Sequence, residues 1–410
     1  MTEQTRVWRA PGMLALAVLS IFGFSGYAAL LAVAPLWVVQ GGATAAGAGL
    51  VNGVLLVATV LTQLAVPRSL ARWGTGGVLV VGLLLLGAPA PGYLISDGLG
   101  WVLALSAVRG MGFGVLTVVG STVVAQLVPA HRRGAAIGVY GLSVAVPNLL
   151  LLPGSVPVVD RWGFAPVFWV AALPLLGVPA ALRLAQVLRA SDRNQRDQAD
   201  QGFRAGVRGL RGIVSPTLVL FSVTMAGGAL LTFAPQLTSA GTAALVLLTM
   251  GAAAALSRWL IGAVADRLGA WLFIPPLLTC AGCALAVCAW AVARDHDLLL
   301  VAAATVLGLC YGALQNLTLV AAFAAVERSH LPAASAGWNI GFDAGTASGS
   351  VVAGALAAAY SFPVSLTTLA GICLLTVVVT LVSAPRGATG RRPVATHGEA
   401  SAAEVSEPQS

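Results

Sequence analysis

Residues 13–38 read MLALAVLSIFGFSGYAALLAVAPLWV, a run without a single charged side chain. A helix needs about 20 mostly apolar residues to cross the hydrocarbon core of a bilayer. This run is long enough, so it predicts a membrane-spanning helix. It is also longer than the hydrophobic region of a typical secretory signal, and we expect it to remain as an uncleaved first helix.

Composition extends this prediction to the rest of the chain. Of its 410 residues, 58% are hydrophobic and 9% are charged, whereas soluble proteins carry roughly 25% charged residues. Apolar runs of spanning length recur between short polar breaks, and internal Gly and Pro are tolerated in packed membrane helices. We therefore predict an all-α integral membrane protein with twelve transmembrane helices, placed at 13–38, 44–66, 75–95, 99–128, 134–157, 163–188, 213–236, 240–264, 270–293, 298–326, 333–358 and 362–384.

The arginines predict the orientation. All 22 basic residues are Arg, and twelve spans place both termini on one side. With the termini inside, only Arg161 and Arg294 fall outside, and Arg109 and Arg258 fall within spans. Since positive side chains favour the cytoplasmic face, we expect both termini in the cytoplasm and the protein in the cell membrane. The same bias explains the net charge of +8 without a nucleic-acid partner.

The polar segment 189–211 divides the spans into six and six. We predict an N-terminal six-helix bundle (1–188), a cytoplasmic linker (189–211), a C-terminal six-helix bundle (212–384) and a disordered cytoplasmic tail (385–410).

Short motifs recur across this divide. Arg72-Trp73-Gly74 follows the second span, and Arg267-Leu268-Gly269 follows the eighth. Within spans four and ten, GMGFG at 110–114 corresponds to GLCYG at 308–312. Matches in corresponding helices predict that the two halves arose by duplication.

These residues resemble the major facilitator superfamily. The segment Gly262 to Gly269 is similar to its cytoplasmic signature Gly-x-x-x-Asp-Arg-x-Gly, and Pro67 and Ala71 replace the Gly and Asp of the first-half copy. Arg109 with the glycines after it resembles the family's span 4 motif. A looser similarity links the chain to the drug:proton antiporter and sugar-efflux-like branch. The resemblance implies two bundles that rock about a central site.

The resemblance also assigns a gating role to the two cytoplasmic loops. The gating residues it implies are Arg72, Gly74, Gly262, Asp266, Arg267 and Gly269. Asp266 would lie near a helix N-terminus or pair with an arginine in one state only. Alternatively, Asp266 and Arg267 merely mark a membrane boundary.

Apart from Arg183 near a cytoplasmic end, three charged side chains fall within predicted spans, and each costs about 2.5–3.5 kcal/mol in mid-membrane. Arg109 lies deep in span four, whereas Arg258 is nearer an end and can extend to the interface. Asp343 is the one carboxyl in mid-membrane. Burial disfavours a charged carboxylate, so Asp343 is a candidate proton carrier, and a structural hydrogen bond is the alternative.

Polar side chains near these residues share helix faces. Asn339, Asp343, Thr346 and Ser350 are spaced by helical turns. Tyr311 and Gln315 likewise share one face of span ten. In the superfamily, spans one, four, seven and ten line the cavity, which directs attention to Tyr27, Arg109, Tyr311 and Gln315, although helix packing alone can also explain each. We expect Asn52, Gln63 and Asn148 to form interhelical hydrogen bonds.

Enzymatic and cofactor sites find little support. The four His residues fall in predicted loops or the tail, and the glycine-rich run at 110–114 lies inside an apolar helix. Small core residues are the better interpretation of the five cysteines, which all lie in spans. We expect no metal and no cofactor, and a polytopic membrane enzyme is a distant alternative.

The sequence thus favours a secondary active transporter that works by alternating access. Because the cavity-facing spans carry few charges, we expect proton-coupled efflux of a small, largely apolar compound by a monomer. The alternative is an importer of a small metabolite, such as a sugar, an organic anion or an amino-acid-like solute; an anion would suit Arg109.

Overall fold

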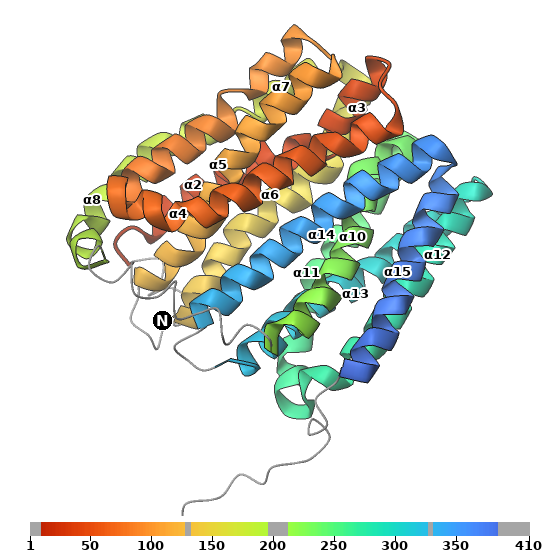
Figure 1. Cartoon of the computed structure of the whole chain (residues 1–410). Helices are drawn as coiled ribbons and strands as arrows, with labels where there is room; N and C mark the ends of the chain where they lie inside the picture. Colours follow the sequence, from red (N-terminus) through yellow and green to blue (C-terminus); the bar gives the residue numbers. More distant parts are fainter. Residues whose placement is uncertain (1–9, 128–132, 196–211, 327–330, 384–410) are drawn as a thin grey trace, which may run out of the picture.

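The structure is a computed structural model that describes residues 10–127, 133–195, 212–326 and 331–383. These residues fold almost entirely into helices (Figure 1). The first half contains α2 (Met13–Leu31), α3 (Val33–Gln40), α4 (Ala45–Gly87), η1 (Ala90–Ile95), α5 (Leu99–Gln126), α6 (Arg133–Trp162), α7 (Ala165–Val170), η3 (Leu173–Gly177) and α8 (Val178–Gln195). The second contains α10 (Val214–Leu237), α11 (Ala240–Leu268), η5 (Ala270–Leu272), α12 (Ile274–Ala293), α13 (Asp297–Ala324), α14 (Leu331–Ala359) and α15 (Phe362–Ser383).

Eleven stretches in the described part of the chain are long and apolar enough to cross a membrane. They match eleven of the twelve predicted spans. The twelfth, α14, is a 29-residue helix that is long enough but less apolar. It carries Asn339, Asp343 and several small residues, and it packs against α4 and α10 rather than standing apart from the bundle. Its polarity is therefore concentrated where other helices cover it.

Two predicted boundaries change. Residues 189–195 of the expected linker continue α8 as helix, and the remainder of the linker lies outside the described residues, as does the C-terminal tail. The second and third spans are joined into α4, which is interrupted only at Gly74.

Two glycines at corresponding positions of the two halves have similar backbone angles. Gly74 has φ 72° and ψ 166°, and Gly269 has φ 87° and ψ 137°, a region that L side chains rarely adopt. Each glycine follows its Arg and reverses the chain into the next helix. The glycine of Arg-x-Gly is therefore required by the turn in both halves.

Helix contacts repeat in the same way. A Cβ on Gly110 of α5 would meet the carbonyl oxygen of Leu55 on α4, and a Cβ on Gly308 of α13 would meet that of Met250 on α11. Leu55 and Met250 are separated along the chain by the same interval as Gly74 and Gly269. Small residues thus bring the same pair of helices into backbone contact in each half.

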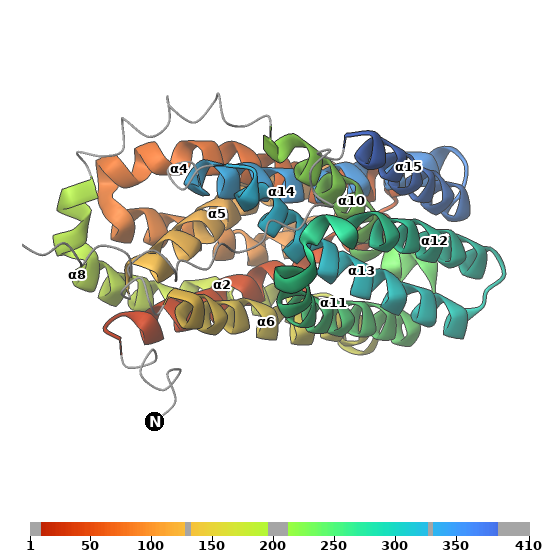
Figure 2. The same ribbon diagram turned by 90° about the horizontal axis from the view of Figure 1, so that it is seen from below.

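Each half has an apolar interior, and the halves meet along a limited set of helices. One cluster, including Leu83, Val119 and Leu184, fills part of the N-terminal half. A larger cluster fills the C-terminal half and continues across the interface to residues of the N-terminal half such as Tyr93 and Phe168. Between the halves, α14 packs on α4, and α6 packs on α11. Figure 2 shows the two halves side by side, with α14 next to α4 as in Figure 1.

The α4–α14 contact is tightest where α4 begins and α14 ends. A Cβ on Gly49 would meet the carbonyl oxygen of Ser350, and a Cβ on Gly354 would meet that of Ala45. The two backbones therefore touch at this end of the interface, which we call the closed end. It lies opposite the ends of the molecule where α2 begins and α15 stops.

Candidate central site between the two halves

Asp343 lies on α14 and is 6% exposed. Its Oδ2 accepts a hydrogen bond of 2.8 Å from Nε2 of Gln63 on α4. The same amide nitrogen lies 3.2 Å from Oγ1 of Thr117 on α5. The carbonyl oxygen of Gln63 is buried and has no hydrogen-bond partner among the described residues. The mid-membrane carboxyl thus contacts the opposite half of the molecule through one amide.

Tyr27 on α2 approaches the same place from the N-terminal half. Its ring stacks on Phe113 of α5, with centroids 3.8 Å apart and planes 5° from parallel. Its hydroxyl lies near the side chains of Asp343 and Tyr311. Tyr27 also packs against Leu55, Leu56 and Ala347, which bridge α4 and α14.

The C-terminal half contributes Tyr311 and Gln315 of α13. The hydroxyl of Tyr311 lies near the side chains of Gln315 and Thr346, and its ring lies 6.3 Å from that of Phe342. Gln315 is 2% exposed, and its side-chain carbonyl oxygen has no hydrogen-bond partner in the part of the chain that the structure describes. We call this set of side chains the central cluster; its members are Tyr27, Gln63, Tyr311, Gln315, Asp343 and Thr346.

Arg109 is held inside the N-terminal half. It is fully buried, and it donates from Nη2 to the carbonyl oxygen of Gly26 at 2.6 Å and from Nε to that of Leu86 at 3.2 Å. Its guanidinium lies 5.8 Å from the centroid of the Tyr93 ring. Carbonyl dipoles and an aromatic face stabilise a cation removed from water. Arg109 interacts electrostatically with Tyr27, and the bonds named here tie α5 to α2 and α4.

The amide nitrogen of Asn339 donates to the carbonyl oxygen of Ser335, one turn earlier in α14. This bond does not join Asn339 to the central cluster. Of the three amides expected to bond between helices, Asn52 and Gln63 do so. Asn148 instead donates to the carbonyl oxygen of Val144 in its own helix. An Asn side chain can bond either to another helix or to a carbonyl of its own helix, and the residue type alone does not distinguish the two.

A second polar group ties the halves together at the closed end. Nδ2 of Asn52 donates to the carbonyl oxygen of Leu31 at 2.7 Å and to Oγ1 of Thr232 at 2.9 Å. Thr232 and Ser350 share a hydroxyl–hydroxyl bond of 2.8 Å. The Asn52–Thr232–Ser350 chain therefore connects α4 to α10 and α14. Ser350 belonged to the polar stripe read from the sequence, but its partner Thr232 carried no pattern that marked it.

The gating residues are only partly described. Arg72 is exposed, and Gly74 and Gly269 form the two turns already given. The side chains of Asp266 and Arg267 lie outside the described residues, as do the surroundings of Gly262, whereas the side chain of Arg258 is exposed. The backbone carbonyl of Arg258 accepts a hydrogen bond from Asn316.

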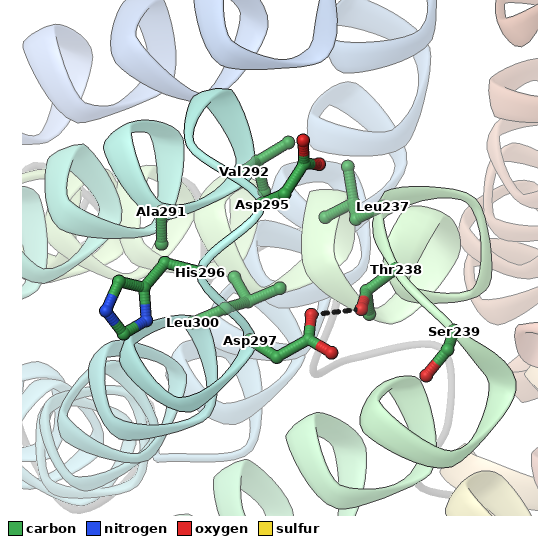
Figure 3. Close-up of a pocket in the computed structure, with 9 residues that line it drawn as sticks. All are labelled: Leu237, Thr238, Ser239, Ala291, Val292, Asp295, His296, Asp297 and Leu300. Atoms are coloured by element: carbon green, nitrogen blue, oxygen red, sulfur yellow. Dashed lines mark hydrogen bonds between the residues drawn. The ribbon is translucent and has the colours of Figure 1, made fainter.

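A polar pocket of about 250 Å³ opens elsewhere, between the end of α10, the end of α12 and the start of α13 (Figure 3). Asp297 lies at its wall and accepts bonds from Thr238 at 2.6 Å and Thr242 at 2.8 Å. These bonds fasten the α12–α13 turn to the α10–α11 turn. The pocket contains no member of the central cluster, so it is separate from the candidate site.

Solved structures share this fold. A POT family transporter in complex with 5-aminolevulinic acid superposes with a TM-score of 0.72 at 14% identity, covering 92% of this chain and 97% of that one. The nucleoside transporter NupG superposes with a TM-score of 0.69 at 14% identity, covering 91% of this chain and 100% of that one. A bacterial homolog of the human lysosomal transporter Spinster, in an inward-facing and unoccupied conformation, superposes with a TM-score of 0.67 at 14% identity. The match covers 94% of this chain and 96% of that one.

Sequence comparison gives the family. An uncharacterised MFS-type transporter of Mycobacterium tuberculosis (strain ATCC 25618 / H37Rv) is 30% identical over 120 residues, which span 29% of this chain and 21% of that relative. The sequence model of the Major Facilitator Superfamily matches residues 14–297 and 276–407, which together cover most of the chain. The chain therefore belongs to the Major Facilitator Superfamily, and it is a multi-pass membrane transporter rather than an enzyme.

Proposed function

We propose that the protein exports a small, largely apolar compound from the cytoplasm in exchange for protons, by alternating access, with Asp343 as the proton carrier. This places it with the drug:proton antiporter and sugar-efflux-like branch of its family. The observation that carries the proposal is the Gln63–Asp343 hydrogen bond, which joins the two halves. Among the described residues, Asp343 is the only carboxyl in the middle of a long helix.

Protonation would change this contact. The ionised carboxyl of Asp343 accepts from Gln63 but has no proton to donate. A protonated carboxyl donates as well, and the unpartnered carbonyl oxygen of Gln63 is a buried acceptor beside it. Gain or loss of one proton therefore alters the bonding between α4 and α14, which is the coupling that proton-driven transport requires.

Alternating access requires the closed end to open. The backbones of α4 and α14 touch there, and the Asn52–Thr232–Ser350 chain crosses the interface. An open state must break these contacts, while Gly110 and Gly308 hold the helix pairs within each half. Rigid halves joined by a breakable interface fit rocking of one bundle against the other.

The bonds of Arg109 favour efflux of an apolar compound over import of an anion. Its guanidinium donates to carbonyl groups of Gly26 and Leu86 within the N-terminal half. An organic anion would have to compete with those carbonyls. The proposal also includes localisation in the cell membrane, both termini in the cytoplasm and a monomeric state.

Direction and coupling are tested with inverted and right-side-out vesicles. A thermal-shift screen of the purified protein first identifies a compound that raises its melting temperature. That compound should accumulate in inverted vesicles when their lumen is acidified, and an uncoupler should release it. Accumulation in right-side-out vesicles under an inward proton gradient would establish import instead, and uptake that ignores the gradient would establish uniport.

A further inference from the structure

Two of the five cysteines do not belong to the core that was expected for them. Cys280 and Cys283 are exposed on α12, whereas Cys288, Cys310 and Cys373 are buried. Helix α12 packs against α13 and α15 and lies at the outer edge of the C-terminal half (Figures 1 and 2). An exposed side chain in the middle of a membrane-spanning helix at this edge faces lipid. Cys280 is therefore a thiol that a molecule dissolved in the bilayer can reach.

Cys310 of α13 lies beside Cys280. The two helices form an antiparallel pair joined by the short turn 294–296. Cys280 lies thirteen residues before the end of α12 at Ala293, and Cys310 lies thirteen residues after the start of α13 at Asp297. Equal distances from the turn place both residues at the same level, about 20 Å along each helix. The Cys310 side chain is 2% exposed, and its thiol lies near that of Cys280.

The surroundings of this thiol pair are apolar. Helix α12 has no charged side chain, and the only one in α13 is Asp297 at its first residue. Reactive thiolates are usually stabilised by a nearby cation, a metal or a helix N-terminus. Neither helix offers such a group at the level of the pair, so oxidation through a thiolate is disfavoured. A ligand that binds both sulfurs and leaves no net charge suits lipid better, because a charge there is costly.

Trivalent arsenic meets these requirements, since soft thiol ligands favour soft elements. Phenylarsine oxide is a neutral, lipid-soluble form of it. When it reacts with two thiols, the bonds from arsenic to oxygen break and two As–S bonds form. The two thiol protons leave with the oxide oxygen as water. The oxidation state of arsenic does not change, so no oxidant is needed, and the product is neutral. Three-coordinate arsenic is pyramidal and takes adjacent sulfurs, whereas mercury(II) prefers two sulfurs on opposite sides.

We propose that Cys280 and Cys310 form a two-thiol site that binds trivalent organoarsenic compounds from the bilayer. Cys280 is the exposed thiol that reacts first, and the buried Cys310 completes the chelate between α12 and α13. The site contains no member of the central cluster, although Cys310 directly precedes Tyr311 in the chain. The inference is therefore independent of the proposed transport function.

Phenylarsine oxide tests the site on the purified full chain in detergent. After incubation with the compound and an excess of the monothiol mercaptoethanol, intact-mass spectrometry should show one phenylarsenic group per chain. The dithiol dimercaptopropanol should remove this group. Chelation explains the difference, because the second bond forms at the high effective concentration of a neighbouring thiol, which strengthens binding by about 10²–10⁴.

Cys280→Ala and Cys310→Ala should each lose the phenylarsenic group in the presence of the monothiol, since a single thiol cannot chelate. Cys280 is exposed, so its variant should fold like the parent and keeps the test decisive if the Cys310 variant is unstable. Cys283→Ala is the matched control. Cys283 is exposed on the same helix, three residues after Cys280, and offers the alternative chelating pair. This variant should retain the group as the parent does.

Binding that survives in Cys310→Ala would assign the arsenic to Cys280 and Cys283 and overturn the inference. Binding that survives in Cys280→Ala, or that is lost in Cys283→Ala, would overturn it as well. Release of the group by the monothiol in the parent would show that the two thiols do not act together. A disulfide between Cys280 and Cys310 in the untreated chain would also contradict the proposal, because neither thiol would then be free.

Discussion

The amide nitrogen of Gln63 and the carboxylate oxygen of Asp343 are 2.8 Å apart, although 280 residues separate them in the chain. They join α4 of the N-terminal half to α14 of the C-terminal half. Each is buried, so this single bond is a direct polar link between the two halves of the transporter.

Asp343→Asn separates a proton carrier from a structural group. Asn keeps the size of Asp and an oxygen that accepts from Gln63, but it cannot exchange a proton. We expect gradient-driven transport to be lost, while solute exchange without net proton movement continues. Vesicle uptake with and without an imposed pH gradient measures both.

Asp343→Leu is the companion variant. It leaves the amide of Gln63 without its acceptor, so the melting temperature should fall as expected for the loss of about 1–3 kcal/mol. Full gradient-driven transport by Asp343→Asn would exclude Asp343 as the proton carrier.

Asn52→Leu should weaken the closed end. The change removes the bond to Thr232 that crosses between the halves. Interhelical hydrogen bonds in membranes contribute about 0.6 kcal/mol on average, which corresponds to a roughly threefold shift toward the open state. A cysteine at Ala353, which is 1% exposed in the closed end, should then react faster with a thiol reagent in an otherwise cysteine-free chain.

Thr59→Val is the control for Asn52→Leu. The Thr59 hydroxyl bonds to Leu55 and Gly110, both in its own half. Its removal should leave labelling at Ala353 unchanged, and equal acceleration by both variants would show general loosening instead of release of the closed end.

Alanine at Gly110 or at Gly308 should lower the melting temperature by similar amounts. In each case the new Cβ meets a backbone carbonyl of the neighbouring helix, and overpacking costs about 1–3 kcal/mol. Gly371→Ala is the control, since a Cβ there meets nothing within 4 Å. A strong effect at only one of the paired glycines would argue against equivalent packing in the two halves.

Asp266→Asn tests the gating motif read from the sequence. We expect slower transport with folded yield and ligand affinity nearly unchanged, because a gate residue stabilises one state rather than the fold. Transport rate and equilibrium binding are measured on the same preparation. Parental transport rates would make Asp266 and Arg267 boundary markers.

Orientation is tested by cysteines placed at Arg161 and Arg294, both of which are exposed. In intact cells, an impermeant thiol reagent should label these positions and should not label a cysteine placed within 191–200. Labelling of the linker from outside would reverse the predicted topology.

The sequence by itself determined the class of fold. Long apolar runs can satisfy their backbone groups in lipid only as helices, so their number and spacing predicted the helices of both halves. Local geometry was also readable, because the turns at Gly74 and Gly269 need a φ that favours glycine. The helical spacing of Asp343, Thr346 and Ser350 placed them on one face before their neighbours were known.

Only the tertiary structure decided what those residues contact. Spacing along a helix gives the direction of a side chain but not which helix lies opposite, since that depends on packing between segments far apart in the chain. Gln63 and Asn52 were expected to bond between helices, yet their partners Asp343 and Thr232 came from the other half. Arg109 was readable as a buried cation, but the carbonyls that hold it belong to Gly26 and Leu86 on other helices.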